Sequence, residues 1–182
     1  NYLMCNDSQN NNRWLKVYGR GPKGDMGAFG SKIWLFDSGH MDEMNHLVGY
    51  RQIQNGYAYL CQDDPVQHFG LASRDTVDLK IMLLDSTVLR VPRVAARQRL
   101  FFTKPRGLAV FDGDGQTALP GTELSAPLRV LVIDALGNPA MGVPVTFSIQ
   151  EGLGRFTGEQ TLYTNKQGIA SIRYTTPAAS GS

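Results

Sequence analysis

A short segment of the chain holds four potential metal ligands: His40, Asp42, Glu43 and His46. Imidazole nitrogens and carboxylate oxygens are ligands of zinc, provided that several of them converge. The two histidines are six residues apart, whereas the zinc-binding helix of metalloproteases places them four apart, on one helical face. A regular helix therefore cannot align them, and only an irregular loop could bring them together. The pattern favours a solvated surface loop, and no metal is expected.

A second candidate for chemistry combines Cys61 as nucleophile with His68 as base and Asp63 as acid. Cys61 and His68 are seven residues apart, an odd separation that points their side chains to opposite faces of a strand. Pro65 also interrupts any regular strand between them. The spacing does not support a catalytic group, and the chain is predicted not to be an enzyme.

A glycine-rich stretch at 19–24 satisfies the G-x-G-x-x-G pattern of dinucleotide-binding proteins. That pattern requires a helix directly after the glycines, because the helix N-terminus holds the pyrophosphate. More glycines follow in this chain, and the next expected element is a strand at 32–36. The stretch is predicted to be a long hairpin loop, and no cofactor is expected.

Three acidic residues, Asp112, Asp114 and Glu123, fit ligand positions of a calcium-binding loop. Thr117 occupies the position at which that loop requires glycine for its sharp turn. Because this turn is essential to the coordination geometry, the match is incomplete. No calcium site is predicted.

The composition is that of a globular protein without a strong overall charge. The 182 residues are 42% hydrophobic, and 18 basic against 16 acidic side chains leave a net charge of +2. These values exclude a disordered chain and a dedicated nucleic-acid binder. Six basic residues without an acid lie between Arg90 and Arg106, and they are interpreted as the solvated face of strands. No apolar run reaches the roughly 18 residues that span a bilayer, so membrane insertion is not expected.

Alternation of polar and apolar residues is the dominant pattern of the chain. Turn residues separate the alternating segments at intervals of about 8 to 12 residues. This spacing predicts an all-β fold, and the best helical candidates are short, at 39–47 and 94–98. The alternating segments are 14–18, 32–35, 77–81, 128–132, 143–147 and 169–174.

A break in the alternation divides the chain into two parts. Pro105 and Gly107 follow the last strand-like residues of the first part and predict a linker at 104–107. We therefore expect an antiparallel β domain at 1–103 and a second β domain at 108–182. The chain begins at Asn1 without an initiator methionine, which predicts a processed product or a piece of a longer protein.

Three segments of the first part form one recognisable pattern: 11–17, 94–100 and, above all, Gln-Asp-Asp-Pro-Val-Gln-His-Phe-Gly-Leu at 62–71. This pattern resembles the ASPIC/UnbV family over residues 11–103. Domains of that family commonly follow FG-GAP-type β-propellers in large secreted or surface proteins, and residues 1–10 resemble the tail of such a repeat. The chain departs from the family at Cys61, where a serine is usual.

The second part carries another pattern, at 113–116, 128–139, 142–147 and 164–170. It resembles the bacterial Ig-like domain of group 1, the module repeated in intimin and invasin adhesins. The resemblance implies an Ig-like β-sandwich at 108–182 that lacks its last strand. The residues agree with it, because Gly137 or Asn138 can take the positive φ of a hairpin turn and Pro144 needs an edge position.

Together the two resemblances imply a non-enzymatic structural or adhesive module that is extracellular or at the cell surface. An incomplete sandwich exposes an unpaired strand edge, which implies a homo-oligomer or fibre formed by β-strand addition. The alternative is a module that binds a surface glycan or protein through Tyr50, Tyr57 and Tyr59. Tyrosines in a strand-rich segment are more often core residues and cross-strand pairs.

Cys5 and Cys61 are the two cysteines of the chain. The resemblance of the first part to secreted domains implies that they form a disulfide. The composition alone favours the other interpretation, two buried thiols in an intracellular protein. Both interpretations stay open at the level of the sequence.

Overall fold

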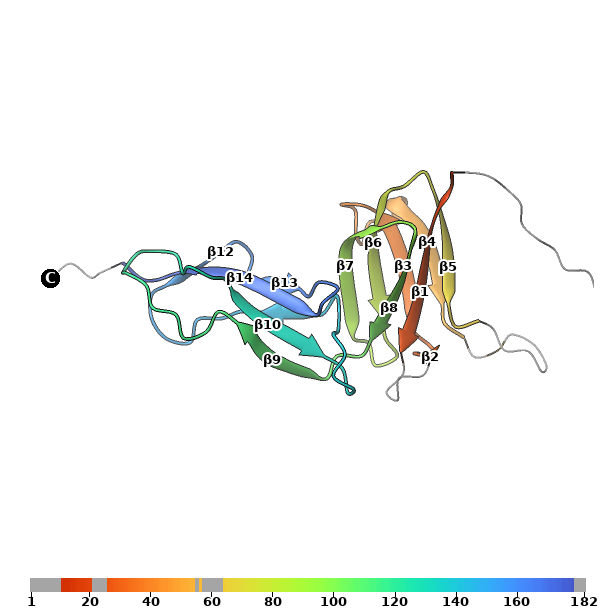
Figure 1. Cartoon of the computed structure of the whole chain (residues 1–182). Coiled ribbons are helices and arrows are strands. Elements are labelled where there is room, and N and C mark those ends of the chain that lie inside the picture. Colours follow the sequence, from red (N-terminus) through yellow and green to blue (C-terminus); the bar gives the residue numbers. More distant parts are fainter. Residues whose placement is uncertain (1–10, 21–25, 55, 57–63, 179–182) are drawn as a thin grey trace, which may run out of the picture.

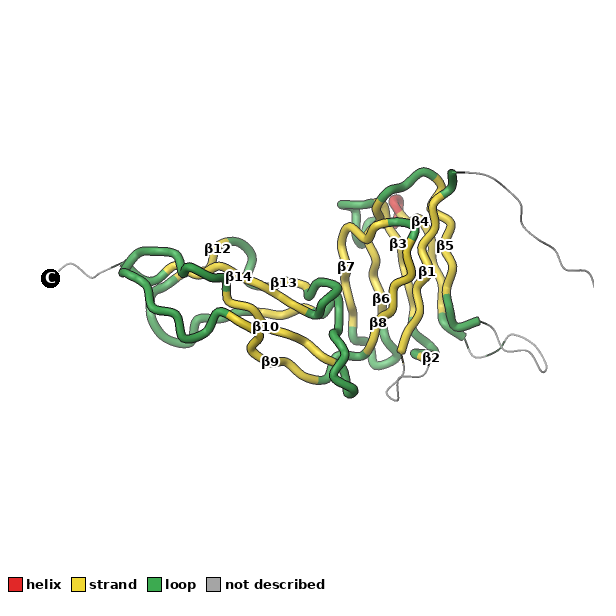
Figure 2. The backbone as a smooth tube through the Cα atoms, viewed as in Figure 1, coloured by secondary structure: helices red, strands yellow, loops and turns green. Residues whose placement is uncertain are grey.

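The regular secondary structure of the described residues is almost entirely β-strand, which confirms the predicted all-β class (Figures 1 and 2). The computed structural model describes residues 11–20, 26–54, 56 and 64–178. Within these ranges the helical structure is one 3-10 turn, η1 (Met44–His46). The helix expected at 39–47 is therefore reduced to its last turn. The prediction of a short helix at 94–98 is wrong, because these residues end one strand, form a bend, and begin the next strand.

The described residues between positions 11 and 103 form a two-layer sandwich, called the N-terminal module below. One sheet consists of β2 (Met26–Gly27), β1 (Arg13–Arg20), β5 (Gln67–Ala72) and β8 (Gln98–Thr103). The other has the order β4 (Leu47–Gln52), β3 (Lys32–Asp37), β6 (Thr76–Met82) and β7 (Val88–Ala95). Alternate side chains of both sheets point inward. The core residues without exposed surface are Leu15, Val17, Ile33, Leu35, Ile53, Leu71, Val77, Leu79, Ile81 and Leu89.

One strand pair of this module departs from the expected antiparallel pattern. β1 and β8 run parallel, with Leu15 opposite Gln98 and Arg20 opposite Thr103. Parallel neighbours need a long connection, and the whole of the other sheet lies between these two strands in the sequence. On its other edge β1 pairs antiparallel with β5.

Residues 107–178 form a second and thinner sandwich, called the C-terminal module below. Its larger sheet has the order β12 (Arg155–Thr157), β14 (Ile169–Thr175), β10 (Leu128–Ile133) and β9 (Gly107–Asp112). Its smaller sheet pairs β11 (Pro144–Thr146) with β13 (Thr161–Tyr163). The core between them is small, because the second layer is short. Its buried residues are Val132, Ala140, Val145 and Ala170.

Two positions of the C-terminal module behave as the sequence predicts. Gly137 has a φ of +81° in the turn after β10, a conformation that glycine adopts without steric cost. Pro144 lies in β11, which has β13 as its one partner in the described part of the chain. Proline cannot donate a ladder hydrogen bond, so an edge strand is the position that tolerates it.

The two modules lie end to end and are joined by Lys104, Pro105 and Arg106 (Figure 1). Their cores are distinct clusters, although Val143 packs against both and Met141 is buried in the N-terminal core. These apolar contacts, together with hydrogen bonds across the junction, couple the ends of the two modules.

Candidate functional site

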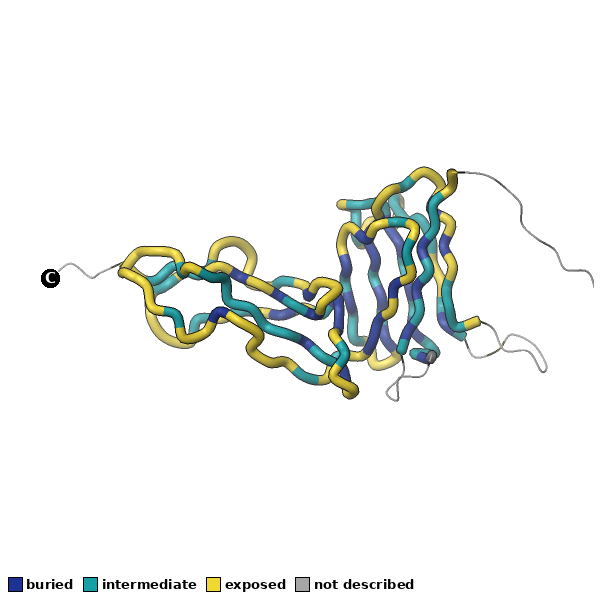
Figure 3. The backbone as a smooth tube through the Cα atoms, viewed as in Figure 1, coloured by how far each residue is buried: buried dark blue, intermediate teal, exposed yellow. Residues whose placement is uncertain are grey.

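The inner face of β9 is the most conspicuous uncovered surface of the C-terminal module. In the β9–β10 pair, Leu108 lies opposite Val132 and Val110 lies opposite Val130. Opposite residues of an antiparallel pair share one face of the sheet, so Leu108 and Val110 point to the side on which Val132 is buried. They are nevertheless 59% and 63% exposed. Figure 3 shows that β9 is exposed along most of its length. The core-facing side of β9 is therefore open to water.

The smaller sheet leaves β9 uncovered because it lies over the β14 side of the larger sheet, whereas β9 lies at the opposite edge. β13 contacts β14, which is separated from β9 by β10 in the larger sheet. The C=O of Val143 accepts a hydrogen bond from the N–H of Thr164, and the N–H of Phe147 donates to the C=O of Gln160, so both residues bond to the two ends of β13. The main chains of Pro144 and Thr146 therefore point to the opposite edge of β11, since main-chain groups alternate between the two edges of a strand. The described part of the chain places no strand along that edge.

The outer edge of β9 also has no partner strand among the described residues, since β9 ends the order of its sheet. Phe111 is an extra residue in β9, because Val130 pairs with Val110 and the preceding residue of β10 pairs with Asp112. Such a bulge is one way of blunting an edge, but Phe111 itself is exposed. Between Gly107 and Phe111 the strand carries no charge that would discourage pairing. β9 and the open edge of β11 together form a site that can accept an added strand.

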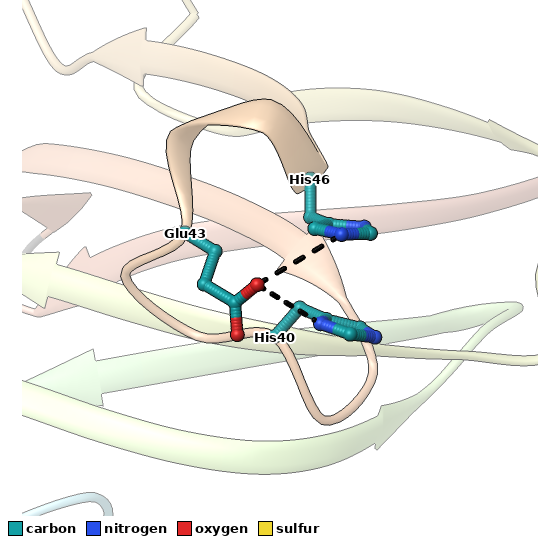
Figure 4. Close-up of side chains that lie close together, drawn as sticks. All are labelled: His40, Glu43 and His46. Atoms are coloured by element: carbon teal, nitrogen blue, oxygen red, sulfur yellow. Dashed lines mark hydrogen bonds and ion pairs between the residues drawn. The ribbon is translucent and has the colours of Figure 1, made fainter.

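Three of the four candidate metal ligands, His40, Glu43 and His46, lie together in the loop between β3 and β4 (Figure 4). The loop makes three successive tight turns, in which the N–H groups of these three residues each donate to the carbonyl three positions earlier. The first two turns each contain a residue with positive φ, Gly39 at +88° and Asp42 at +73°, so the segment is an irregular loop in which only the last turn is 3-10. This irregular loop brings together the two histidines, which a regular helix could not align.

Hydrogen bonds and ion pairs fasten this loop to the sheet, a feature that the prediction of a solvated surface loop did not include. The buried carboxylate of Asp78 accepts hydrogen bonds from the N–H groups of Gly39 at 2.9 Å and Arg93 at 2.8 Å. Asp42 pairs with Lys80 and with an arginine of β7. The hydrogen bond from Lys80, with that from the arginine, holds the pKa of Asp42 below its usual value. Asp42 is thus directed to these cations and fastens the loop to β6 and β7.

We expect Asp78→Asn to lower the free energy of unfolding by roughly 1–2 kcal/mol, because the new amide group cannot accept a hydrogen bond from both main-chain donors. Denaturant unfolding measures the loss, and faster hydrogen exchange at Gly39 locates it in the loop. Asp75→Asn is the matched control, because the Asp75 side chain is exposed and forms an ion pair with Arg13 on the surface. Equal stability of the two variants would contradict the role given to Asp78.

Tyr50 is the one described member of the three candidate ligand-contact tyrosines, since Tyr57 and Tyr59 lie outside the described residues. It lies on β4 opposite Trp34 of β3, with ring centroids 5.3 Å apart. Lys80 lies opposite Trp34 on its other side, with its ammonium 5.8 Å from the indole ring. Tyr50 is 40% exposed, so the cross-strand pair forms an aromatic patch on the sheet surface.

Two of the three carboxylates that fit a calcium loop are directed to cations of neighbouring strands. Asp112 pairs with Arg129 of β10 at 3.6 Å, and Glu123 pairs with Arg173 of β14 at 2.6 Å. Thr117, at the position that requires glycine, lies in the same connection. This segment is therefore organised by ion pairs between strands.

The other candidates are only partly described. His68 lies exposed on β5, with its ring centroid 6.4 Å from that of Trp14.

Within the basic stretch, Lys104 pairs with Asp85 at 2.5 Å and lowers the pKa of that carboxyl to about 2. The disulfide and nucleophile candidates Cys5, Cys61 and Asp63, with residues 21–25 of the glycine-rich stretch, lie outside the described residues.

A cavity of about 750 Å³ lies at the junction of the modules and was not predicted from the sequence. Its walls include Phe29 and Leu84 of the N-terminal module, Arg106 of the connection, and Ala135 of the C-terminal module. These residues are far apart in the sequence and share no motif, so only the packing of the two modules reveals the cavity.

Residues 21–109 match the family described as ASPIC and UnbV. The match confirms the resemblance predicted for the first part, although it begins later and extends into β9. No curated protein sequence matches the chain. None of the helical structure in the described ranges is long and apolar enough to cross a membrane.

Proposed function

We propose that this chain is a non-enzymatic structural or adhesive module of the cell surface or the extracellular space. The ASPIC and UnbV match supports a place in a large surface protein, in which an FG-GAP-type propeller precedes the N-terminal module. The resemblance of residues 105–182 to group 1 bacterial Ig-like domains supports the role of a stiff spacer. Short connections between sandwiches, such as the one at Lys104–Arg106, favour a rod that projects what it carries.

The observation that carries this proposal is the exposure of Leu108 and Val110 on the core side of β9. Apolar side chains on the inner face of a sandwich normally lie under a second layer. A strand added beside β11 would cover them and would gain main-chain hydrogen bonds along the open edge of that strand. We propose that a second copy of this chain donates the strand.

The geometry favours head-to-tail assembly over a closed dimer. Pairing of β9 with β9 of a second copy would extend the larger sheet and leave Leu108 and Val110 uncovered. We propose that the strand added beside β11 comes from a part of the donor other than β9 and β11, so that donor and acceptor surfaces differ. Contacts of this kind propagate into chains or fibres unless the rotation closes a ring.

Sedimentation velocity over a wide range of protein concentration tests the proposal. We expect species larger than the 20.0 kDa monomer, growing in length with concentration and visible as filaments by electron microscopy. A monomer at every concentration, with the β9 amides protected from hydrogen exchange, would show that the sandwich is closed within one polypeptide and would overturn the proposal.

The second candidate function is glycan binding at the Trp34–Tyr50 patch, because sugar rings stack on exposed aromatic side chains. If this is the function, Tyr50→Ala will weaken glycan binding at least tenfold, measured by titration with the oligosaccharide that an array identifies. Tyr163→Ala is the matched control, because Tyr163 is 38% exposed but lies on β13, in the other module. An equal effect of both variants, or no glycan bound by the array, would exclude the patch as a glycan site.

A further inference from the structure

We infer that His40, Glu43 and His46 form a binding site for a divalent transition metal ion, with Zn²⁺ as the first candidate. The site lies in the β3–β4 loop of the N-terminal module, apart from the strand-accepting surface of the C-terminal module. Nδ1 of His40 lies 3.2 Å from Oε2 of Glu43, and Nε2 of His46 lies 3.8 Å from the same oxygen (Figure 4). In a tetrahedral zinc site, ligand atoms are about 3.3 Å apart.

An outer carboxylate orients His46 as in known metal sites. Asp37 Oδ2 lies 3.5 Å from Nδ1 of His46, and the guanidinium of Arg74 holds the other oxygen of that carboxylate at 2.6 Å. A proton on Nδ1 that faces Asp37 leaves the lone pair on Nε2, the nitrogen that faces Glu43. A histidine fixed by a carboxylate in this manner is a recurrent partner of zinc, because the carboxylate sets the tautomer and raises the basicity of the ring.

The backbone that carries the three ligands is already ordered. The tight turns align the ligands, and the contacts of Asp78 and Asp42 fasten both halves of the loop to the sheet. Metal binding then costs less conformational entropy than in a free loop. Asp42 is occupied by Lys80, which separates its anchoring role from the role of Glu43 as ligand.

Binding requires one local rearrangement. The two imidazole rings are stacked, with centroids 3.9 Å apart and planes inclined by 11°. The lone pairs of two parallel rings cannot both point at one ion, so one ring must rotate about its Cβ–Cγ bond. The side chains of His40 and His46 are 44% and 33% exposed, which leaves room for this rotation. The remaining coordination position faces solvent and accepts water or a group from another molecule.

The donor set selects the class of metal. Two imidazoles and one carboxylate suit Zn²⁺, and by the usual order of affinities Ni²⁺ and Cu²⁺ also bind such a set. Ca²⁺ and Mg²⁺ prefer six or more oxygen ligands and are not expected to bind here.

Isothermal titration of the full chain with ZnCl₂, after alkylation of any free thiols, tests the inference. We expect one zinc ion per chain with a Kd in the micromolar range, and no heat from CaCl₂. At zinc concentrations of a hundred times Kd, we expect a rise in Tm of about 5 °C or more in the N-terminal module. Anomalous diffraction at the zinc edge should place the ion between His40 and His46.

Variants separate this site from unspecific binding. His40→Ala and His46→Ala should each raise the Kd for zinc at least tenfold, whereas His68→Ala, which removes the third histidine, should leave it unchanged. Asp37→Ala should raise it roughly 10- to 100-fold through loss of ring orientation, with partial rescue in Asp37→Asn. The inference is overturned if the double variant of His40 and His46 binds zinc as tightly as the native chain, or if His68→Ala loses the ion.

Discussion

We expect replacement of both Leu108 and Val110 by lysine to convert the proposed assembly into a monomer. Each of these side chains loses most of its exposed area under a donated strand, and burial of one such side chain contributes roughly 1.5–3 kcal/mol. Two lysines would instead place charges in the interior of the completed sandwich. We expect the association constant to fall at least a hundredfold, measured by sedimentation velocity.

Leu153→Lys is the control for this experiment, because Leu153 is 90% exposed in a loop of the same module and lies outside its strands. It should assemble as the native chain does. Circular dichroism must show the same strand content in both variants, so that loss of assembly is not loss of fold. If the β9 variant assembles normally, or if both variants fail equally, β9 is not the acceptor surface.

The strands were predictable from the sequence because side chains in a strand alternate with a period of two. The segments 32–35, 77–81 and 128–132 all lie within observed strands, and each has at least one buried residue. The pairing of β1 with β8 was not predictable, since a periodic pattern contains no information about which strands become neighbours. The exposure of β9 was not predictable for a related reason. Leu108 and Val110 alternate as core residues do, and their exposure depends on whether a second layer covers the strand.

The β3–β4 loop shows a different limit of prediction from the sequence. Its residue types were recognised in the sequence, and an irregular loop was the one arrangement expected to bring His40 and His46 together. Three successive tight turns form such a loop, but the sequence contains no motif that predicts the course of the chain through them. Asp37 and Asp78, which order this loop, lie at the end of β3 and inside β6, so their role depends on tertiary contacts.

Asp134→Ala will lower the free energy of unfolding of the protein by about 3 kcal/mol. The carboxylate of Asp134 is buried at the end of β10 and accepts hydrogen bonds from the Thr103 hydroxyl at 2.8 Å and from the N–H groups of Leu136 and Asn138 at 2.8 and 2.9 Å. Its loss leaves the buried Thr103 hydroxyl and two part-buried main-chain N–H groups without this acceptor, which costs more than one hydrogen bond contributes. Thr103→Val removes one of these donors and should cost about 1 kcal/mol.

A double-mutant cycle of Asp134 and Thr103 shows whether the cost reaches across the junction. Thr103 belongs to β8 of the N-terminal module and Asp134 to the C-terminal module. If their hydrogen bond couples the modules, the double variant will be less destabilised than the sum of the single variants, by about 1 kcal/mol. Additive losses would mean that Asp134 stabilises only its own turn.

The pH dependence of Asp134→Asn identifies the charged carboxylate as the stabilising form. Burial raises the pKa of Asp134, but the hydrogen bonds from Asn138, Thr103 and Leu136 lower it by more, so its pKa in the folded protein lies below the usual value. A depressed pKa stabilises the folded state above the unfolded pKa of about 3.9, and this contribution is lost as the pH falls through the folded value. The asparagine variant has no such titration. The difference in unfolding free energy between native chain and variant should therefore be constant from pH 7 to about pH 5 and should shrink below about pH 4. A difference that stays constant down to pH 3 would show that the shape of the side chain, and not its charge, holds the turn.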